Sequence, residues 1–329
     1  MTRADRTVES PPIVEQRLHY RWPISVRFLL GRLFGALISV WGALTIVFIA
    51  LNLSGDPVAS MVSPQASLED IERVRVMLGY DQPLYVQYLT FLKNVVTGNF
   101  PLSLRYAASP TELVFQRFPV TFILALSGMA VGVVLGLTIG YIAANGRREL
   151  VRELPMTLMV GLQALPPILL GVVLVLVFAV NLKWLPSSGS GTWAHLVLPS
   201  LTLGIYVAPS IARIFRTSIL EVQGADHVRT ALAKGLPERV VRLRHVAANA
   251  MIPVTNQIGL QLGAMLGGAV VVETIFAWPG VGQLAVNALT NQDYPVVLAT
   301  VSFVAIVFVG VNLLVDVVSA ILDPRLRVD

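Results

Sequence analysis

The stretch HVRTALAKGLPERVVRLRHVAANAMIP, residues 227–253, is a basic segment with helical patterning between two long apolar runs. It carries five lysine and arginine residues against a single acid, Glu238. Uncharged apolar runs of this length are typical of membrane-spanning helices. We therefore expect residues 227–253 to be a structured loop that joins two spans, and the rest of the chain must indicate what this loop binds.

The composition indicates a membrane protein. The 329 residues are 55% hydrophobic and only 13% charged, whereas a soluble domain has about 25% charged residues. The chain has no cysteine, which excludes disulfides and thiolate metal sites, and its four histidines are scattered. The net charge of +5 fits the basic bias of cytoplasmic loops better than nucleic-acid binding. We expect no metal site and no nucleic-acid partner.

Six apolar runs are long enough to be transmembrane helices. They cover residues 33–54, 120–144, 155–181, 196–212, 255–276 and 296–315. The fourth run is short enough to be marginal. Pro166 and Pro167 should kink or break the third run, because proline lacks the backbone N–H that a helix needs. The sequence predicts an all-α polytopic membrane protein with six transmembrane helices.

The basic residues predict the orientation of the chain. Of its 24 lysines and arginines, 18 lie on the side of both termini and of residues 227–253, and 6 lie on the other side. The side rich in lysine and arginine is the cytoplasmic one. We therefore expect a cytoplasmic segment 1–32, an uncleaved first span 33–54, an extracytoplasmic insertion 55–118, and a five-helix core 119–329 that includes the cytoplasmic loop 217–254.

The extracytoplasmic segments contain two features of interest. In the insertion, Ser67 and Asp70 resemble a capping box at the start of a helix, and a second amphipathic helix is expected over 84–96. These helices could lie on the outer bilayer surface or form a docking surface for an external partner. Between the last two spans, residues 276–295 contain a Trp-Pro-Gly turn signal followed by a short apolar helix. This loop could be a re-entrant lid or an interfacial turn, and the sequence favours the turn.

Small and polar residues within the spans indicate how the helices pack. Glycines recur at four-residue spacing in the second and fifth spans, which allows helix backbones to approach closely. These two glycine ladders are Gly132, Gly136 and Gly140, and Gly259, Gly263 and Gly267. The fifth span also carries Asn256, Gln257 and Gln261, which could line a translocation pathway or form interhelical hydrogen bonds.

The spans indicate that any transport must be driven by another subunit. Ion-coupled carriers usually place ionisable side chains inside the membrane, but Glu273 near the outer end of the fifth run is the only such residue in the six runs. The chain also has no glycine-rich phosphate-binding loop. A nucleotide-driven motor would have to be a separate chain that contacts a cytoplasmic surface.

Residues 219–253 have the pattern of such a contact surface. A first helix is expected over 219–234, and Gly235 is placed to end it. Pro237 is placed to start a second helix over 238–250, which Pro253 would close. This arrangement predicts a helix-turn-helix. A basic amphipathic loop that rests on anionic lipid would have similar charges.

The order of residues in this loop resembles a known family. Asp226, Arg229-Thr230-Ala231 and Ala233-Lys234-Gly235, followed by His245, Asn249-Ala250 and Pro253, are similar to the cytoplasmic "EAA" loop of binding-protein-dependent ABC importer permeases, closest to the dipeptide/oligopeptide/nickel branch. Further matches are LGYDQPL at 78–84, LPSSG at 185–189, LPSLTL at 198–203, and Glu273-Thr274, Trp278-Pro279-Gly280 and Asp293-Tyr294-Pro295. The stretch GNFPLS at 98–103 departs from the pattern of this branch.

The resemblance implies a permease subunit of an ATP-driven importer in a bacterial plasma (inner) membrane. Its partners would be a second homologous permease, two ATP-binding subunits or one fused ATPase chain, an extracytoplasmic substrate-binding protein and membrane lipid. ATP and Mg would bind to the partners, and the chain itself would hold no cofactor and would not be an enzyme. An ion-coupled secondary carrier and a non-transporting scaffold are the alternatives. A dipeptide, an oligopeptide, a nickel chelate and a glutathione-like solute are not separable as substrates.

The resemblance also implies which residues carry these roles. The ATPase-coupling residues would be Asp226, Arg229, Thr230, Ala231, Lys234, Gly235, Glu238, His245, Asn249 and Pro253. The residues at the binding-protein side would be Phe276, Trp278, Pro279, Gly280, Asp293 and Tyr294.

Overall fold

The computed structural model describes residues 26–53, 58 and 67–322, and this part of the chain is helical with a single isolated β-bridge between Ser103 and Ala108. The first helices are α1 (Val26–Leu53), α3 (Leu68–Leu78), α4 (Leu84–Thr97), α5 (Pro110–Asn145), α6 (Glu149–Gln163), α7 (Pro167–Leu174) and the π-helix η1 (Val175–Asn181). The later ones are α8 (Trp193–Gln223), α9 (Asp226–Ala233), α10 (Glu238–Val240), the π-helix η2 (Val241–Ala247), α11 (Ala248–Ile275), α12 (Val281–Thr290) and α13 (Tyr294–Leu322). Most of the predicted N-terminal segment 1–32 lies outside the described residues.

The described helices allow up to six membrane spans. Four helices, α1, α5, α8 and α13, are individually long and apolar enough to cross a membrane. Two bent pairs qualify when each is counted as one span: α6 with α7 and η1, and the helix that begins at Glu238 with its continuation to Ile275. The first pair is bent by 106° where Pro166 and Pro167 separate its halves. This bend confirms the predicted break, since a proline ring cannot continue the hydrogen-bond ladder.

The fourth span is longer than its sequence suggested. The predicted run 196–212 is only the middle of α8, which has 31 residues and extends to Gln223. Past the apolar run the helix still buries Phe215 and Ile219 in the core, and Arg216 forms an ion pair with Glu153 of α6, with N–O distances of 2.5 and 3.2 Å. The predicted start of a cytoplasmic helix at residue 219 is therefore wrong: residues 219–223 belong to α8, and the next helix begins at Asp226.

Glycines set the closest helix packing in the described core, between α5 and α8. A Cβ atom added to Gly136 would lie 2.7 Å from Cβ of Ile211 and 2.9 Å from the carbonyl oxygen of Ala208. Contacts this short are not tolerated between real side chains, so the glycine ladder of the second span confirms its predicted role. The predicted packing role of the glycine ladder in the fifth span is confirmed only in part. Gly259 and Gly263 contact α13, but nothing lies within 4 Å of a Cβ atom added at Gly267.

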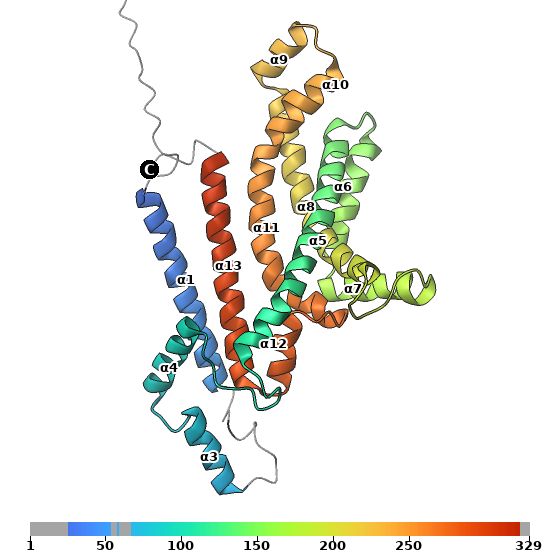
Figure 1. The fold of residues 1–329 in the computed structure, drawn as a ribbon. Coiled ribbons are helices and arrows are strands. Elements are labelled where there is room, and N and C mark those ends of the chain that lie inside the picture. Colours follow the sequence, from blue (N-terminus) through green and yellow to red (C-terminus); the bar gives the residue numbers. More distant parts are fainter. Residues whose placement is uncertain (1–25, 54–57, 59–66, 323–329) are drawn as a thin grey trace, which may run out of the picture.

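The elements outside the spans gather at the two ends of the bundle. α9 and α10 lie at one end, and α3 and α12 lie at the other, with α1 and α13 side by side along one flank (Figure 1). The predicted insertion helices are present as α3 and α4. Ser67 caps α3 by accepting a hydrogen bond from the backbone N–H of Asp70 at 3.1 Å, and the Ser67 hydroxyl lowers the pKa of the Asp70 carboxyl by donating to it.

Candidate functional site

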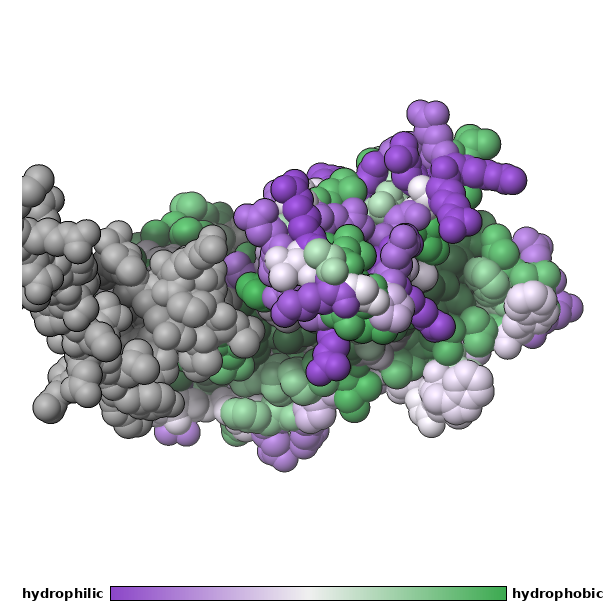
Figure 2. Space-filling view, turned by 90° about the horizontal axis from the view of Figure 1, so that it is seen from above, coloured by the Kyte–Doolittle hydropathy of each residue, from purple (hydrophilic) through white to green (hydrophobic). Residues whose placement is uncertain are grey.

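A helical hairpin built from α9, α10 and η2 forms one end of the molecule. Hydrophilic side chains gather at this end (Figure 2). Gly235 ends α9 in the left-handed conformation, with φ of 76°, and its N–H donates to the Leu232 carbonyl at 2.9 Å. Pro237 then caps α10. The predicted glycine stop and proline start are confirmed, and a side chain at residue 235 would be strained because L-residues rarely adopt this φ.

The second arm of the hairpin is continuous with the fifth span. Pro253 was expected to close this arm, but it lies inside α11, and one helical segment extends from Glu238 to Gly267. An interior proline removes one backbone hydrogen bond, a loss that packing of α11 against α8 and α13 outweighs. The second arm of the hairpin and the first part of the fifth span therefore form one helical segment, which bends by 49° before its continuation to Ile275.

The hairpin has an apolar inner face and a charged outer face. Val228 and Ala231 of α9 pack with Val241 and Val246 of η2, and all four are at most 6% exposed. Ala231 therefore contacts the chain's own core, and its small size lets α9 lie close to η2. The other expected coupling residues are exposed except His245, which is half-buried; the exposed ones are Asp226, Arg229, Thr230, Lys234, Gly235, Glu238, Asn249 and Pro253.

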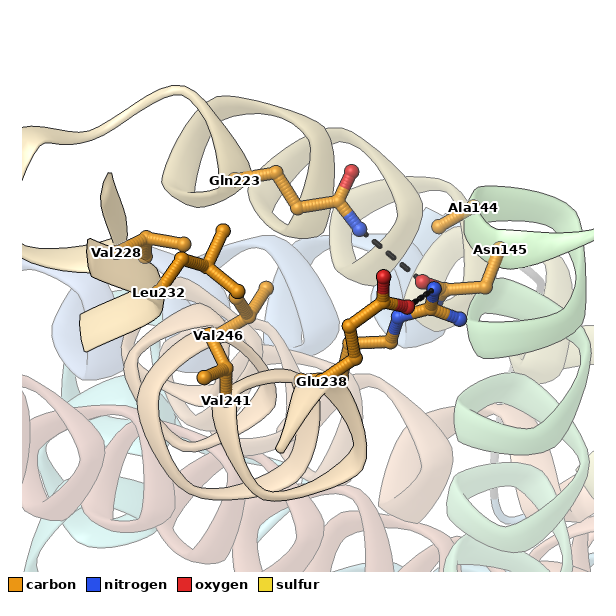
Figure 3. Close-up of a pocket in the computed structure, with 9 residues that line it drawn as sticks. Ala144, Asn145, Gln223, Val228, Leu232, Glu238, Val241 and Val246 are labelled. Carbon is orange, nitrogen blue, oxygen red and sulfur yellow. Dashed lines mark hydrogen bonds and ion pairs between the residues drawn. The ribbon is translucent and has the colours of Figure 1, made fainter. Parts of the chain in front are cut away.

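A cavity of about 380 Å³ lies between the hairpin and the ends of α5 and α8. Gln223 donates to the Asn145 side chain at 3.1 Å, and Glu238, which also lines the cavity, forms an ion pair with Arg242 at 2.6 Å (Figure 3). Val228 and Val246 line the opposite side. This cavity could not be predicted from the sequence, because its walls come from segments up to 102 residues apart. It leaves space between the hairpin and the neighbouring helix ends.

At the opposite end, a buried carboxylate anchors α12. Glu273 is fully buried and accepts hydrogen bonds from the Thr121 hydroxyl at 2.5 Å and from the Gln283 backbone N–H at 2.9 Å. Thr121 in turn accepts from the Val281 N–H at 2.8 Å. The first turn of a helix has unsatisfied N–H groups, so Glu273 and Thr121 together cap α12. A Cβ atom at Gly280 would overlap Glu273 and Thr121.

Sequence reasoning missed Glu273 as a site residue. The available signal was a lone carboxylate at the end of an apolar run, six residues before Pro279-Gly280. The expected short helix after this turn is α12, and it is more than an interfacial turn, since Val281, Leu284 and Ala288 are buried against other helices.

The residues expected at the binding-protein side are largely turned inward. Phe276, Trp278, Asp293 and Tyr294 are at most 7% exposed. The Trp278 indole N–H donates to the Val120 carbonyl at 3.0 Å, and the Pro279 carbonyl accepts from Arg117 at 3.3 Å. These residues shape the loop 276–295, and the side chains of Phe276, Trp278, Asp293 and Tyr294 are not available at its surface.

Asp293 also ties the insertion to this end of the bundle. Its carboxylate accepts a hydrogen bond from the Ser103 hydroxyl at 2.5 Å, and both residues are buried. Ser103 belongs to the stretch 98–103 that departs from the family pattern, yet it makes this contact. Burial raises the pKa of the nearby Tyr80 phenol to about 12, with Tyr294 and Asp293 adding to the effect.

The amides of the fifth span lie along α11. Asn256 is exposed, and Gln257 and Gln261 are half-buried. Among the described residues, no group of three or more His, Cys, Asp or Glu side chains could hold a metal ion.

Comparison with known proteins identifies relatives over nearly the whole chain. Residues 136–328 match the family model described as "Binding-protein-dependent transport system inner membrane component", and residues 25–125 match the model "Binding-prot-dependent transport system membrane comp, N-term". The chain is 40% identical over 303 residues to the glutathione transport system permease protein GsiC of Escherichia coli (strain K12), covering 92% of this chain and 99% of GsiC. The GsiC protein of Shigella dysenteriae serotype 1 (strain Sd197) matches equally well.

Two solved structures share the fold. An inward-facing form of the MetNI methionine ABC transporter matches with a TM-score of 0.51 at 16% identity, covering 64% of this chain and 96% of that chain. An amino acid ABC transporter with histidines matches with a TM-score of 0.50 at 14% identity, covering 64% and 94%.

Proposed function

This chain belongs to the family of binding-protein-dependent transport system inner membrane components, and from that premise we propose that residues 221–253 couple it to a separate ATPase and that it carries a peptide-like solute. The chain is the permease subunit of an ABC importer, a multi-pass protein of the inner membrane. Such a permease works with an ATPase subunit, a substrate-binding protein and a second permease. We take the ATPase to be two ATP-binding subunits or one fused chain, and both termini to be cytoplasmic.

The continuous helix from Glu238 to Gly267 is the observation that carries the coupling proposal. The hairpin presents charged side chains outward at Asp226, Arg229 and Glu238, which are 74% to 98% exposed. On the inner face of the hairpin, Val228, Val241 and Val246 pack into the hydrophobic core. If the ATPase binds the outer face, closure of the ATPase would move the hairpin and, with it, the fifth span. This is the kind of rigid-body motion by which a permease changes between two facing states.

The family assignment also bears on the alternatives. Neither an ion-coupled carrier nor a non-transporting scaffold would need a charged hairpin that continues into a membrane span.

We propose that Asn256, Gln257 and Gln261 lie along the translocation pathway, because amides can bind a polar solute without a fixed charge. The anchored outer loop that contains Trp278 would supply the shape against which the binding protein docks.

We propose a small peptide-like substrate, as the name of the relative GsiC suggests. A glutathione-like tripeptide and an ordinary short peptide share a peptide backbone and charged ends. The described spans contain no charged cluster that would select one of them, so selection would rest with the binding protein.

The coupling proposal is tested with substitutions on the outer face of the hairpin. Arg229→Glu reverses an exposed charge, and Gly235→Trp places a large side chain where φ is 76°. Both should reduce co-purification of the ATPase and ATP-dependent uptake at least about tenfold. Arg73→Glu, an equally exposed charge reversal on α3 at the other end, is the matched control and should leave both unchanged. Wild-type ATPase binding by both hairpin variants would refute the proposal.

A further inference from the structure

Helix α4 packs against the outer half of the first span. The Tyr88 hydroxyl hydrogen-bonds to the Thr45 hydroxyl at 2.7 Å, and the ring of Phe48 lies 5.2 Å from Tyr88 and 5.7 Å from Phe91. Thr45 and Phe48 belong to the span Leu30–Leu53, whose hydropathy is that of a lipid-embedded helix. α4 lies beside this part of α1 (Figure 1). It is therefore at the level of the membrane and not above it.

The two flanks of α4 differ in polarity. Tyr85, Leu89 and Val96 are 61% to 87% exposed, and at 100° per residue they fall within about 40° of one another. On the other flank, Gln87 donates to the Gln82 carbonyl at 2.7 Å, and it faces the outer loops. α4 is thus amphipathic, and its apolar flank is uncovered by the described chain.

The apolar flank continues into a groove between α4, α5 and α13. The groove has a volume of about 330 Å³, and Val96, Phe115, Phe303 and Ile306 line it. Ile306 lies 12 residues inside α13, or about 18 Å from its outer end at 1.5 Å per residue. The Ser302 hydroxyl also lines the groove, is 2% exposed, and has no hydrogen-bond partner among the described residues.

We propose that this surface, the apolar flank of α4 with the groove beside it, binds the acyl chains of outer-leaflet phospholipids. On α1, the exposed residues Trp41 and Ile49 lie four residues before and after Thr45, which contacts α4, so they share a side of the helix with it. Exposed apolar side chains of a spanning helix face hydrocarbon. Lys93 borders the flank, where its long side chain can reach a lipid phosphate. α4 is then a half-inserted helix of the outer leaflet that holds the first span against the bundle.

The neighbouring helix α3 is more highly charged, although Val76 and Met77 on it are also exposed. It carries ion pairs between Arg73 and Glu69 and between Arg75 and Glu72. Such a surface is suited to water, so the two insertion helices have different surroundings: α4 contacts lipid and α3 remains outside the membrane. This inference rests on the proposed orientation, with both termini in the cytoplasm, and does not depend on the coupling proposal.

The absence of cysteine allows a direct test. Leu89→Cys and Val96→Cys probe the apolar flank, Thr90→Cys is the matched control on the polar side of the same helix, and Arg73→Cys reports on α3. Each full-length variant, purified with its associated subunits, is labelled with bimane and reconstituted in phosphatidylethanolamine and phosphatidylglycerol vesicles. Quenching by doxyl-labelled phospholipid is compared with quenching by iodide.

Labels at Leu89 and Val96 should be quenched by doxyl lipid at least about twofold more than those at Thr90 and Arg73, with the reverse order for iodide. Strong iodide quenching at both flank positions would show a water-facing surface and overturn the proposal. Weak quenching by both reagents would show a protein interface, such as one with the binding protein or the second permease, and would overturn it equally. The two flank positions are independent, so one misfolded variant leaves the other informative.

Discussion

Replacing Thr121 with valine should loosen the end of the bundle that contains α12. The substitution keeps the shape of the side chain and removes its hydroxyl, which donates to Glu273 and accepts from the Val281 N–H. Both partners are buried, so no water can replace the lost group. The carboxylate keeps its bond from Gln283, but the first N–H of α12 loses its acceptor.

The expected size of this effect comes from two groups that lose Thr121 as their partner, the Oε1 atom of Glu273 and the backbone N–H of Val281. A buried donor or acceptor left without a partner costs about 1–3 kcal/mol, so Thr121→Val should lower stability by about 2–6 kcal/mol. The unfolding entropy is about 2.1 cal/mol/K per residue, which for a chain of 329 residues converts this loss into a melting temperature roughly 3–9 °C lower. Thr121→Ser keeps the hydroxyl and loses one methyl group, worth about 1 kcal/mol, so it should melt within about 2 °C of the wild type.

The assay is thermal unfolding of the purified protein in detergent, followed by the fraction that remains monodisperse on size exclusion. Cleavage within residues 276–295 by a non-specific protease gives a local readout, because a loosened α12 should be cut faster. If Thr121→Val melts and is cleaved like Thr121→Ser, the hydroxyl does not hold α12 and our account of this end is wrong.

Three further predictions follow from other contacts. Gly136→Val should lower the melting temperature by roughly 1–4 °C, since overpacking costs about 1–3 kcal/mol. Gly267→Ala, which has open space, should leave it unchanged, and equal effects would contradict the packing account. The Tyr80 phenol has a pKa of about 12 in the folded chain and about 10 when unfolded. Between these values the folded state binds more protons, so the free energy of unfolding should fall as pH rises from 10 to 12. In Tyr80→Phe this fall should be shallower, and an unchanged pH profile would argue against burial of the phenol. Ser103→Ala removes a buried hydrogen bond to Asp293, worth about 1.5–3 kcal/mol, and should make the insertion more sensitive to trypsin; unchanged cleavage would show that this bond does not hold it.

Several features of the fold could be predicted from short stretches of sequence because their causes are local. The length of each apolar run predicts a span, and Pro166-Pro167 breaks the third one because proline lacks an N–H. Gly235 ends α9 because glycine adopts positive φ without strain. The same local logic located the capped start of α3 at Ser67. The charged hairpin could likewise be recognised from its residue order.

Other features depend on residues that meet only in the folded chain. α8 extends past its apolar run, where Phe215 and Ile219 pack into the core and Arg216 pairs with Glu153, 63 residues away. α11 continues through Pro253 because its packing outweighs one lost hydrogen bond. The anchoring role of Glu273 is visible only in the folded chain, where its side chain accepts a hydrogen bond from Thr121, 152 residues away in sequence.

The sequence by itself determined the spans, their order and the charged hairpin, since the membrane requires every apolar run to be helical and proline and glycine act on their own turn of the chain. The tertiary structure decided which polar groups are buried, which face of α4 the described chain leaves uncovered, and that one helical segment extends from the hairpin at Glu238 into the fifth span as far as Gly267. The physical reason is that a buried polar or apolar group is stable only beside a suitable partner, and which segments become neighbours is a property of the packed bundle.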